Sequence, residues 1–326
     1  MMKKEMRLPA LILAAAVMTA LPLSAQAQDN QGVRIRGLTR IDTTVRLDRG
    51  GAVDLSLISG KIRVTGWDRS DVKVSASIDN GVLRFNANSS RVSLSVDDSD
   101  EDGGRGRRHN NVGDATYDVS VPRGSRLILE AVSGDVTAKG SQGEIEASSV
   151  SGDVDVSDGV RSVSAEAVSG GVRVASVNGD LRAESVSGDL RVDGVSGNVE
   201  TSTVSGSIRL MRIQSKDVRA ETVSGDISYS GTIEPAGRYG FESHSGELRL
   251  YIPKGAGAQF SIETFSGDLS TDFPVTVQPT PRGSRRQEGR VEFTTGDGRA
   301  RVTAQSFSGR IVINSGTDST TRRDDE

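Results

Sequence analysis

The sequence contains no cysteine, which excludes disulfide bonds, thiolate metal sites and a lipid-modified N-terminal cysteine. Aromatic residues make up only 4% of the chain, so we expect no large globular core. Glycine, in contrast, occurs 38 times, and valine recurs too regularly for a disordered chain. These features predict a regular array of small β-forming residues.

The first residues have the pattern of a secretory signal peptide. Lys3, Lys4 and Arg7 form a basic segment, and the apolar run from Leu11 to Ala20 is shorter than the roughly 20 residues that span a bilayer. Ala25-Gln26-Ala27 then provides a small-x-small cleavage site. We therefore predict a signal peptide over 1–27 and export to the periplasm, the cell surface or the extracellular space.

The charge of the mature chain bears on its partners. Removing residues 1–27 takes away three basic residues and one acidic residue, so the formal net charge moves from −4 to −6. This mild acidity argues against nucleic acid or an anionic lipid as a partner. No second apolar segment follows, so we expect no membrane span in the mature chain.

A nine-residue repeat dominates the middle of the sequence. From Ser169 the chain reads SGGVRVASV, NGDLRAESV, SGDLRVDGV, SGNVETSTV and SGSIRLMRI. The Ser-Gly pairs at Ser133, Ser151 and Ser169 are 18 residues apart, and those at Ser224 and Ser245 are 21 apart. A repeat of this kind is typical of a solenoid.

The apolar positions of each unit distinguish a solenoid from a meander. Leu190 and Val192 share one face of a strand, but Val195 reaches the same core only if the chain bends just before it. Repeated corners supply this bend, whereas Ser-Gly hairpins do not. We therefore predict an all-β, parallel β-solenoid (β-helix) with 18–21-residue coils. Gly188 and Gly197 should lie at corners, with positive φ or close backbone approach.

The residue before each Ser-Gly or Asn-Gly pair is predicted to form one inward column of the core. Valine gives way to larger side chains where the period lengthens, as expected if a wider coil needs more filler. The column comprises Val132, Val150, Val168, Val177, Val186, Val195, Val204, Val223, His244, Phe265 and Phe307.

The rest of the chain divides around this array. We expect an N-terminal β region or early coils over 28–130, acting as a cap, with a mobile loop at 97–114. The solenoid array should cover 131–314, with a second loop at 279–289. A polar tail over 315–326 would protect the terminal edge.

Three motifs carry a resemblance to a known family. They are GWD at 66–68, VPRG at 121–124 leading into VSGDV at 132–136, and the long series of VSGD units. Together they resemble the bacterial envelope family called domain of unknown function 4097, whose members are proposed adhesins. The resemblance covers roughly residues 33–313. It implies a β-solenoid at the cell envelope and no particular functional residue.

The acidic residues at the corners have two interpretations. Stacked carboxylates could hold calcium, but toxin-type calcium repeats place the ligand Asp at position 6, which here is Val, Ala or Thr. The simpler interpretation is that these side chains accept backbone N–H groups of the turn. We predict no metal and no cofactor. The residues are Asp135, Asp153, Asp180, Asp189, Asp226, Asp268 and Glu247.

A second acidic row lies three residues before each Ser and offers an extended charged face. It includes Glu166 and Glu184, and we place Arg173, Arg182 and Arg191 with them as a candidate face for a glycan or protein partner. Ion pairing between coils explains the same register without a partner. The row comprises Glu130, Glu166, Glu184, Glu221, Glu242 and Glu263, and ends in Gln305.

No arrangement in the sequence is typical of catalysis. The two histidines, His109 and His244, fall in a predicted loop and in the predicted core, and no Ser has a partnered His. We therefore expect a non-enzymatic exported envelope or surface protein, an adhesin or scaffold, whose partner the residues do not name. A degenerate carbohydrate-active β-helix enzyme and a calcium-stabilised repeat module are the alternatives.

Overall fold

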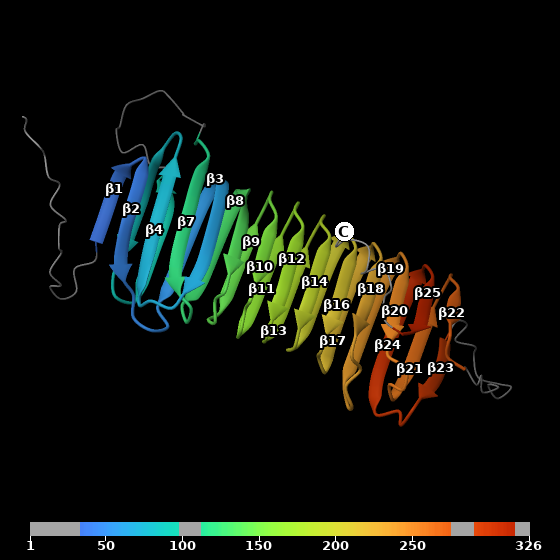
Figure 1. Ribbon diagram of the computed structural model, residues 1–326. Coiled ribbons are helices and arrows are strands. Elements are labelled where there is room, and N and C mark those ends of the chain that lie inside the picture. Colours follow the sequence, from blue (N-terminus) through green and yellow to red (C-terminus); the bar gives the residue numbers. More distant parts are fainter. Residues whose placement is uncertain (1–32, 98–111, 275–289, 317–326) are drawn as a thin grey trace, which may run out of the picture. The chain divides into compact units, whose positions relative to one another are not determined.

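Alternating apolar and polar residues produce strands throughout the part of the chain that the structure describes. A computed structural model describes residues 33–97, 112–274 and 290–316, and every regular element in these ranges is a strand, 25 in all (Figure 1). The strands lie side by side in coils, and most neighbouring coils pair in parallel. The predicted all-β parallel solenoid is confirmed.

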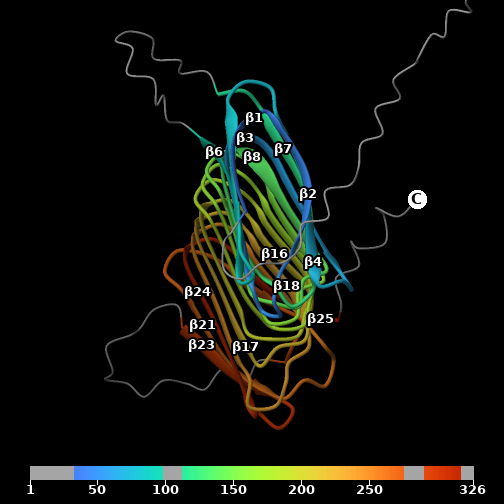
Figure 2. The ribbon, with the colours of Figure 1, turned by 90° about the vertical axis from the view of Figure 1, so that its left-hand side faces the viewer.

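Each coil contributes one strand to each of two sheets, which form two layers when the stack is viewed from its N-terminal end (Figure 2). Sheet I contains, in spatial order, β1 (Val33–Leu38), β5 (Val82–Ala87), β6 (Arg91–Asp97), the first part of β3 (Ala52–Trp67), the first part of β8 (Arg126–Lys139), β9 (Ile145–Ser149), β11 (Ser162–Ala167), β13 (Asp180–Ser185), β15 (Val199–Ser205), β17 (Asp217–Ser224), β19 (Arg238–Ser245), β24 (Ala300–Ser308), β21 (Ala258–Thr264) and β23 (Arg290–Thr295). Sheet II contains β2 (Arg40–Arg46), β4 (Asp71–Ile78), β7 (Ala115–Pro122), the second parts of β3 and β8, β10 (Val154–Ser157), β12 (Val172–Val177), β14 (Leu190–Val195), β16 (Ile208–Ile213), β18 (Ile227–Gly231), β20 (Leu248–Ile252), β25 (Ile311–Ser315) and β22 (Leu269–Thr271).

The two ends of the stack differ from its middle. At the N-terminal end β3 already pairs in parallel with β8, so regular coils begin before residue 131. Antiparallel strands extend this end: β5 and β1 in sheet I, and β4 and β2 in sheet II. At the other end β23 runs antiparallel along β21.

The last coil of the sequence is not the last coil of the stack. β24 pairs with both β19 and β21, and β25 pairs with both β20 and β22. Residues 300–315 therefore lie between two coils that precede them in the sequence. The skipped position lies between β20 and β21, and the 42-residue step from Ser266 to Ser308 is long because it also contains β22 and β23.

The predicted inward valine column is wrong for most of its members. Val177 and Val195 are buried, but Val132, Val150, Val168, Val186, Val204, Val223, Phe265 and Phe307 are among the exposed large hydrophobic residues, and His244 is exposed as well. The reason is that the two halves of a coil are not equivalent. Sheet I strands alternate without a break, so Ser185 points inward and Val186 outward.

Sheet II strands contain the bend that sheet I strands lack. Ser176 has a φ of 56° and Gly194, its neighbour in the next coil, a φ of 70°. Asp158 and Arg212 hold the same position in adjoining coils, with φ values of 58° and 51°. This left-handed residue rotates the chain, so that Val177 and Val195 turn back into the core.

Small side chains fill the narrow coils and aromatic rings fill the wide ones. Coils of 18 residues bury valine, leucine and alanine, whereas Tyr229, Tyr239 and Phe241 are buried where the step is 21 residues. The Tyr229 ring centre lies 6.1 Å from that of Tyr239 and 5.1 Å from that of Phe241. The expected larger filler therefore exists, but it lies on the strands rather than before the Ser-Gly pairs.

Glycines at the corners allow successive coils to approach closely. A Cβ at Gly188 would lie 1.9 Å from the carbonyl oxygen of Gly170, and a Cβ at Gly197 would lie 2.2 Å from that of Gly179. Close backbone approach at both corners is confirmed, and positive φ is not required there. Glycine is needed at these positions because no other residue lacks a Cβ.

Several predicted segments lie outside the described residues: the signal peptide, most of the 97–114 loop, His109, the 279–289 loop and nearly all of the polar tail. Over the described ranges, the structure has no helix long and apolar enough to cross a membrane.

Candidate binding face

An exposed apolar ridge follows the outer edge of sheet I. Each of its residues comes just after an inward-facing residue at the end of a sheet I strand, so the normal alternation directs it to solvent. In spatial order the apolar ridge consists of Val132, Val150, Val168, Val186, Val204, Val223, His244, Phe307 and Phe265.

Buried hydroxyl groups lie directly beneath the ridge. Ser185 donates a hydrogen bond to the carbonyl oxygen of Gly170 (3.1 Å), and Thr203 donates to that of Gly188 (3.2 Å). Ser149, Thr222 and Ser243 make the equivalent bond in other coils. At each of these corners the inward position is thus occupied by a small polar residue, whose hydroxyl group satisfies a buried carbonyl oxygen. The ridge residue that follows it on the strand points outward.

The C-terminal part of the ridge is aromatic. His244 and Phe307 are stacked with ring centres 4.7 Å apart, and Phe307 and Phe265 are stacked at 4.9 Å, each pair with an interplanar angle of 5°. Phe307 is covered by a ring on both faces and presents mainly its edge to solvent, whereas His244 and Phe265 each have one face against Phe307. Phe265 is 77% exposed, the largest value among the exposed large hydrophobic residues.

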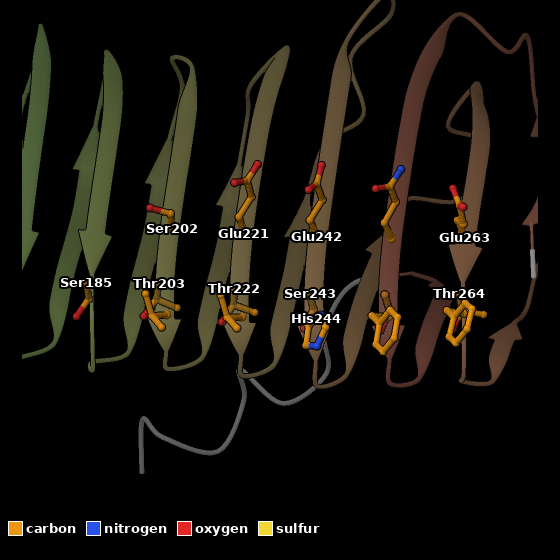
Figure 3. A pocket seen from close by; sticks show the side chains of 16 residues that line it. Ser185, Ser202, Thr203, Glu221, Thr222, Glu242, Ser243, His244, Glu263 and Thr264 are labelled. Atoms are coloured by element: carbon orange, nitrogen blue, oxygen red, sulfur yellow. The ribbon is translucent and has the colours of Figure 1, made fainter.

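A glutamate row runs parallel to the ridge, two residues before the ridge residue on six of the strands, while Ser148, Ser202 and Gln305 hold this position on the others. We define it as Glu130, Glu166, Glu184, Glu221, Glu242 and Glu263. Glu166 pairs in register with Glu184, and Glu221 with Glu242, while Gln305 separates Glu242 from Glu263. The predicted stacking is confirmed for Glu166 with Glu184 and for Glu221 with Glu242. Figure 3 shows Glu221 and Glu242 on neighbouring strands and Glu263 in line with them, beyond the intervening strand β24.

The glutamate row is neutralised in the middle of the stack but not toward its C-terminal end. Arg182 forms ion pairs with Glu184 and, at 2.9 Å, with Glu200. Arg219 likewise pairs with Glu221. Among the described residues Glu242 and Glu263 have no ion-pair partner, because Gly240 and Ser261 occupy the positions that Arg182 and Arg219 hold in earlier coils. Arg290 lies opposite Glu263 in the β21–β23 ladder, but it pairs with Glu292.

Ridge and row together border a shallow groove of about 690 Å³. Its apolar side is formed by Val204, Val223, His244, Phe307 and Phe265, and its acidic side by Glu221, Glu242 and Glu263. Figure 3 shows His244 and the three glutamates from the open side. The groove thus combines an apolar wall with two carboxylates, Glu242 and Glu263, that have no ion-pair partner in the described part of the chain, which suits a ligand with both apolar and positively charged groups.

The five residues of the predicted partner face do not lie together. Glu166, Arg182 and Glu184 are outward-facing residues of sheet I, whereas Arg173 and Arg191 lie on β12 and β14 of sheet II. Arg173 pairs there with Asp153 (3.0 Å) and Asp155 (3.7 Å). A single face containing all five is therefore wrong, because a nine-residue step carries the chain from one sheet to the other.

The corner carboxylates accept backbone hydrogen bonds from the next coil. Asp189 accepts from the N–H of Ser207 (2.8 Å), Asp226 from that of Glu247 (2.8 Å) and Asp153 from that of Gly171 (2.9 Å). The Gly171 N–H, together with the Arg173 guanidinium, holds the pKa of the Asp153 carboxyl below its ordinary value. No group of three or more acidic or histidine side chains is placed to hold a metal ion in the part of the chain that the structure describes.

The aromatic groove was not predicted from the sequence, although one signal was present. The position before Ser-Gly, which is valine in most repeats, is occupied by His244, Phe307 and Phe265 in the last ones. The sequence also places a Glu or Gln two residues before each of them. Only the direction in which they point was misjudged. Glu242 and Glu263 were recognised as members of the row, but not as its unpaired members.

The chain is similar to two solved structures, and one family model matches it. The chain is similar to a proposed adhesin from Bacteroides fragilis (13% identity, TM-score 0.38, covering 84% of this chain and 96% of that one). It is also similar to a proposed cell adhesion protein from Clostridium sporogenes (13% identity, TM-score 0.21, covering 85% and 99%). No curated protein matches the sequence. The model of the Toastrack family, DUF4097, matches residues 51–314, and the chain belongs to this family.

Proposed function

We propose that this chain is an exported, non-enzymatic surface protein, an adhesin or scaffold, which binds a cationic and apolar protein segment along the apolar ridge and glutamate row. The observation that carries the proposal is the continuity of the ridge. Single exposed valines are ordinary on protein surfaces, but a contiguous apolar row bordered by polar residues marks an interaction surface.

The ridge is suited to association because of its shape. Solenoids present extended surfaces whose repeated side chains follow the coil spacing of about 4.8 Å. Covering exposed apolar surface contributes about 25 cal/mol per Å², so a partner that lies along several coils gains more than one that contacts a single valine. The aromatic end offers the largest apolar side chains of the ridge.

The negative charge of the groove favours a partner with basic side chains. Glu242 and Glu263 have no ion-pair partner among the described residues. Glu242 also lies in register with Glu221 on the neighbouring strand, and like charges in this arrangement repel one another. Lysine or arginine side chains of a partner would relieve this repulsion. A second copy of this chain would instead bring another glutamate row against the first, so a self-association through this face is disfavoured.

The stacked rings favour a protein segment over a glycan. Sugars pack on the open faces of aromatic rings, and the central ring, Phe307, has both of its faces covered by His244 and Phe265. Ring edges and valine methyl groups instead form a ridge that fits leucine, valine or phenylalanine side chains. We therefore propose that the partner is a protein segment in which basic and apolar residues alternate.

Export is proposed from the sequence of residues 1–27, which lie outside the described residues. Expression of the full chain in a bacterial host, fractionation and N-terminal sequencing test it. The mature protein should begin at Gln28 and be absent from the cytoplasm. A chain that stays in the cytoplasm and retains Met1 would contradict export.

The binding proposal is tested with synthetic peptides. A peptide of alternating lysine and leucine should bind the native protein, whereas alternating glutamate and leucine should not, and alternating lysine and serine should bind more weakly. The double variant Glu242→Gln/Glu263→Gln should weaken binding by about tenfold. Asp42→Asn/Asp48→Asn is the matched control, since it removes the same charge from exposed residues outside the groove.

Two outcomes would overturn the proposal. One is equal binding of the acidic and basic peptides. The other is an equal loss of affinity in the groove variant and in the Asp42/Asp48 control, which would show an unspecific effect of net charge. A third result would assign the ridge to self-association instead: the free protein sediments as a dimer, and Val204→Ser and Phe265→Ser sediment as monomers.

A further inference from the structure

A second groove lies at the opposite edge of the stack and has the opposite charge. The ridge follows the ends of sheet I strands, whereas this groove of about 950 Å³ is formed by turns at the edge where sheet II strands end. Three turns meet there, between β2 and β3, β3 and β4, and β7 and β8, and Gln142 adds a fourth contribution. Turns that a rigid sheet holds in place are common positions for binding residues.

The single tryptophan of the chain lines this groove. Trp67 is part-buried, and its Nε1–H donates a hydrogen bond to the backbone carbonyl oxygen of Asp71 (2.7 Å). The guanidinium carbon of Arg69 lies 4.8 Å from the centre of the indole ring. The ring is therefore held in one orientation while part of it remains open to the groove.

Two of the four arginines that line the groove have carboxylate partners. Arg123 pairs with Asp68 at 2.8 Å, and Arg69 pairs with Asp71 at 3.4 Å. These bonds fix the two guanidinium groups beside Trp67. They also use both of the carboxylates that line the groove.

The other two arginines, Arg46 and Arg49, have no ion-pair partner among the described residues. Arg46 lies opposite Asp71 in the β2–β4 ladder, but the Asp71 carboxylate is engaged by Arg69. Four arginines and two aspartates leave the lining with two surplus positive charges, although the whole chain has a net charge of −4. Arginine that lacks a carboxylate in a concave site is suited to an anionic ligand.

We propose that this groove binds a ligand that carries a phosphate monoester. The dianion of a phosphate monoester matches the two surplus charges, and its oxygens accept paired N–H donors from the Arg46 and Arg49 guanidinium groups. The open part of the Trp67 ring contacts the portion of the ligand next to the phosphate. The site is independent of the ridge, so its failure would leave the proposed function of sheet I untouched.

Trp67 fluorescence reports on the site without background, because the chain has no other tryptophan. The full protein is titrated at constant ionic strength with inorganic phosphate, with glucose 6-phosphate, with glucose, and with phosphatidylcholine vesicles that do or do not contain phosphatidic acid. Saturable change with phosphate and glucose 6-phosphate, but not with glucose, is expected. A response to phosphatidic acid vesicles alone would assign the phosphate to a lipid headgroup.

The double variant Arg46→Gln/Arg49→Gln should bind at least about tenfold more weakly, since it removes the charge-assisted hydrogen bonds. Arg191→Gln/Arg209→Gln is the matched control. These exposed arginines of sheet II also lack ion-pair partners among the described residues, and their removal changes the net charge equally. Absence of any saturable response, or equal weakening in both variants, would overturn the proposal.

Discussion

Val177 and Val186 occupy the same position in consecutive sequence repeats, yet Val177 is 1% exposed and Val186 is 45% exposed. The difference comes from the residue before each valine. Ser176 adopts a φ of 56° and turns the chain back toward the core, whereas Ser185 continues the regular alternation of its strand. A left-handed residue at this position, present in successive coils from Asp158 to Arg212, thus determines which valines build the core and which build the ridge.

The left-handed position predicts a reciprocal pair of substitutions. Ser176→Gly should raise the free energy of unfolding by about 0.5–1 kcal/mol, because glycine adopts positive φ without the steric cost of a Cβ. Gly194→Ser, at the same position one coil away, should lower it by a similar amount. Urea unfolding measures both, and changes of the same sign in the two variants would contradict the assignment.

The corner glycines predict a large effect that depends on position. Gly188→Ala would place a Cβ 1.9 Å from the Gly170 carbonyl oxygen, so the coils must separate, and we expect a loss of about 2–3 kcal/mol. Gly124→Ala is the control, since a Cβ there meets nothing within 4 Å. Equal melting temperatures of the two variants would show that the coils are not stacked through their glycines.

The hydroxyl groups beneath the ridge predict a smaller effect. Ser185→Ala removes the donor to the Gly170 carbonyl oxygen and should cost about 1 kcal/mol. Ser202→Ala, on the outward side of the next sheet I strand, should change the free energy of unfolding by much less. Chemical denaturation of the two variants in parallel decides the matter, and a larger loss for Ser202→Ala would refute the inward placement of Ser185.

The hydrogen bond to Asp153 predicts a dependence of stability on pH. The folded-state pKa of this carboxyl is lowered, chiefly by the Gly171 N–H. Its contribution is therefore fully present above the unfolded-state pKa of about 3.9, and it is lost as the pH falls through the folded-state value. Between about pH 5 and pH 3 the wild type should lose more stability than Asp153→Asn. The urea midpoints of the two proteins, measured across this pH range, check the prediction. Midpoints that fall by the same amount in the wild type and in Asp153→Asn would contradict it.

Much of the fold could be predicted from the sequence because the repeat determines it. The regular Ser-Gly steps and the alternation of residues such as Leu190 and Val192 require stacked parallel coils with narrow corners. The corner aspartates were likewise interpretable, because Asp153 and Asp189 sit where a turn exposes backbone N–H groups. Local chemistry was sufficient for these features.

The direction of the valines could not be predicted in the same way. Serine rarely adopts positive φ, so nothing in the residue type of Ser176 distinguishes it from Ser185. The assignment of Arg173 and Arg191 to the sheet of Arg182 failed for a related reason, since nine residues are half a coil rather than a whole one. The insertion of β24 beside β19 depends on long-range pairing that no local pattern records.

The central claim is that the ridge before the Ser-Gly pairs faces solvent, and thiol labelling tests it most directly. The chain has no cysteine, so Val186→Cys and Val177→Cys each introduce one thiol at equivalent positions of the repeat. Under native conditions Val186→Cys should react with a maleimide nearly as fast as an unfolded peptide, and Val177→Cys at least about a hundredfold more slowly. Equal protection of the two thiols would place both valines in the core and contradict the ridge.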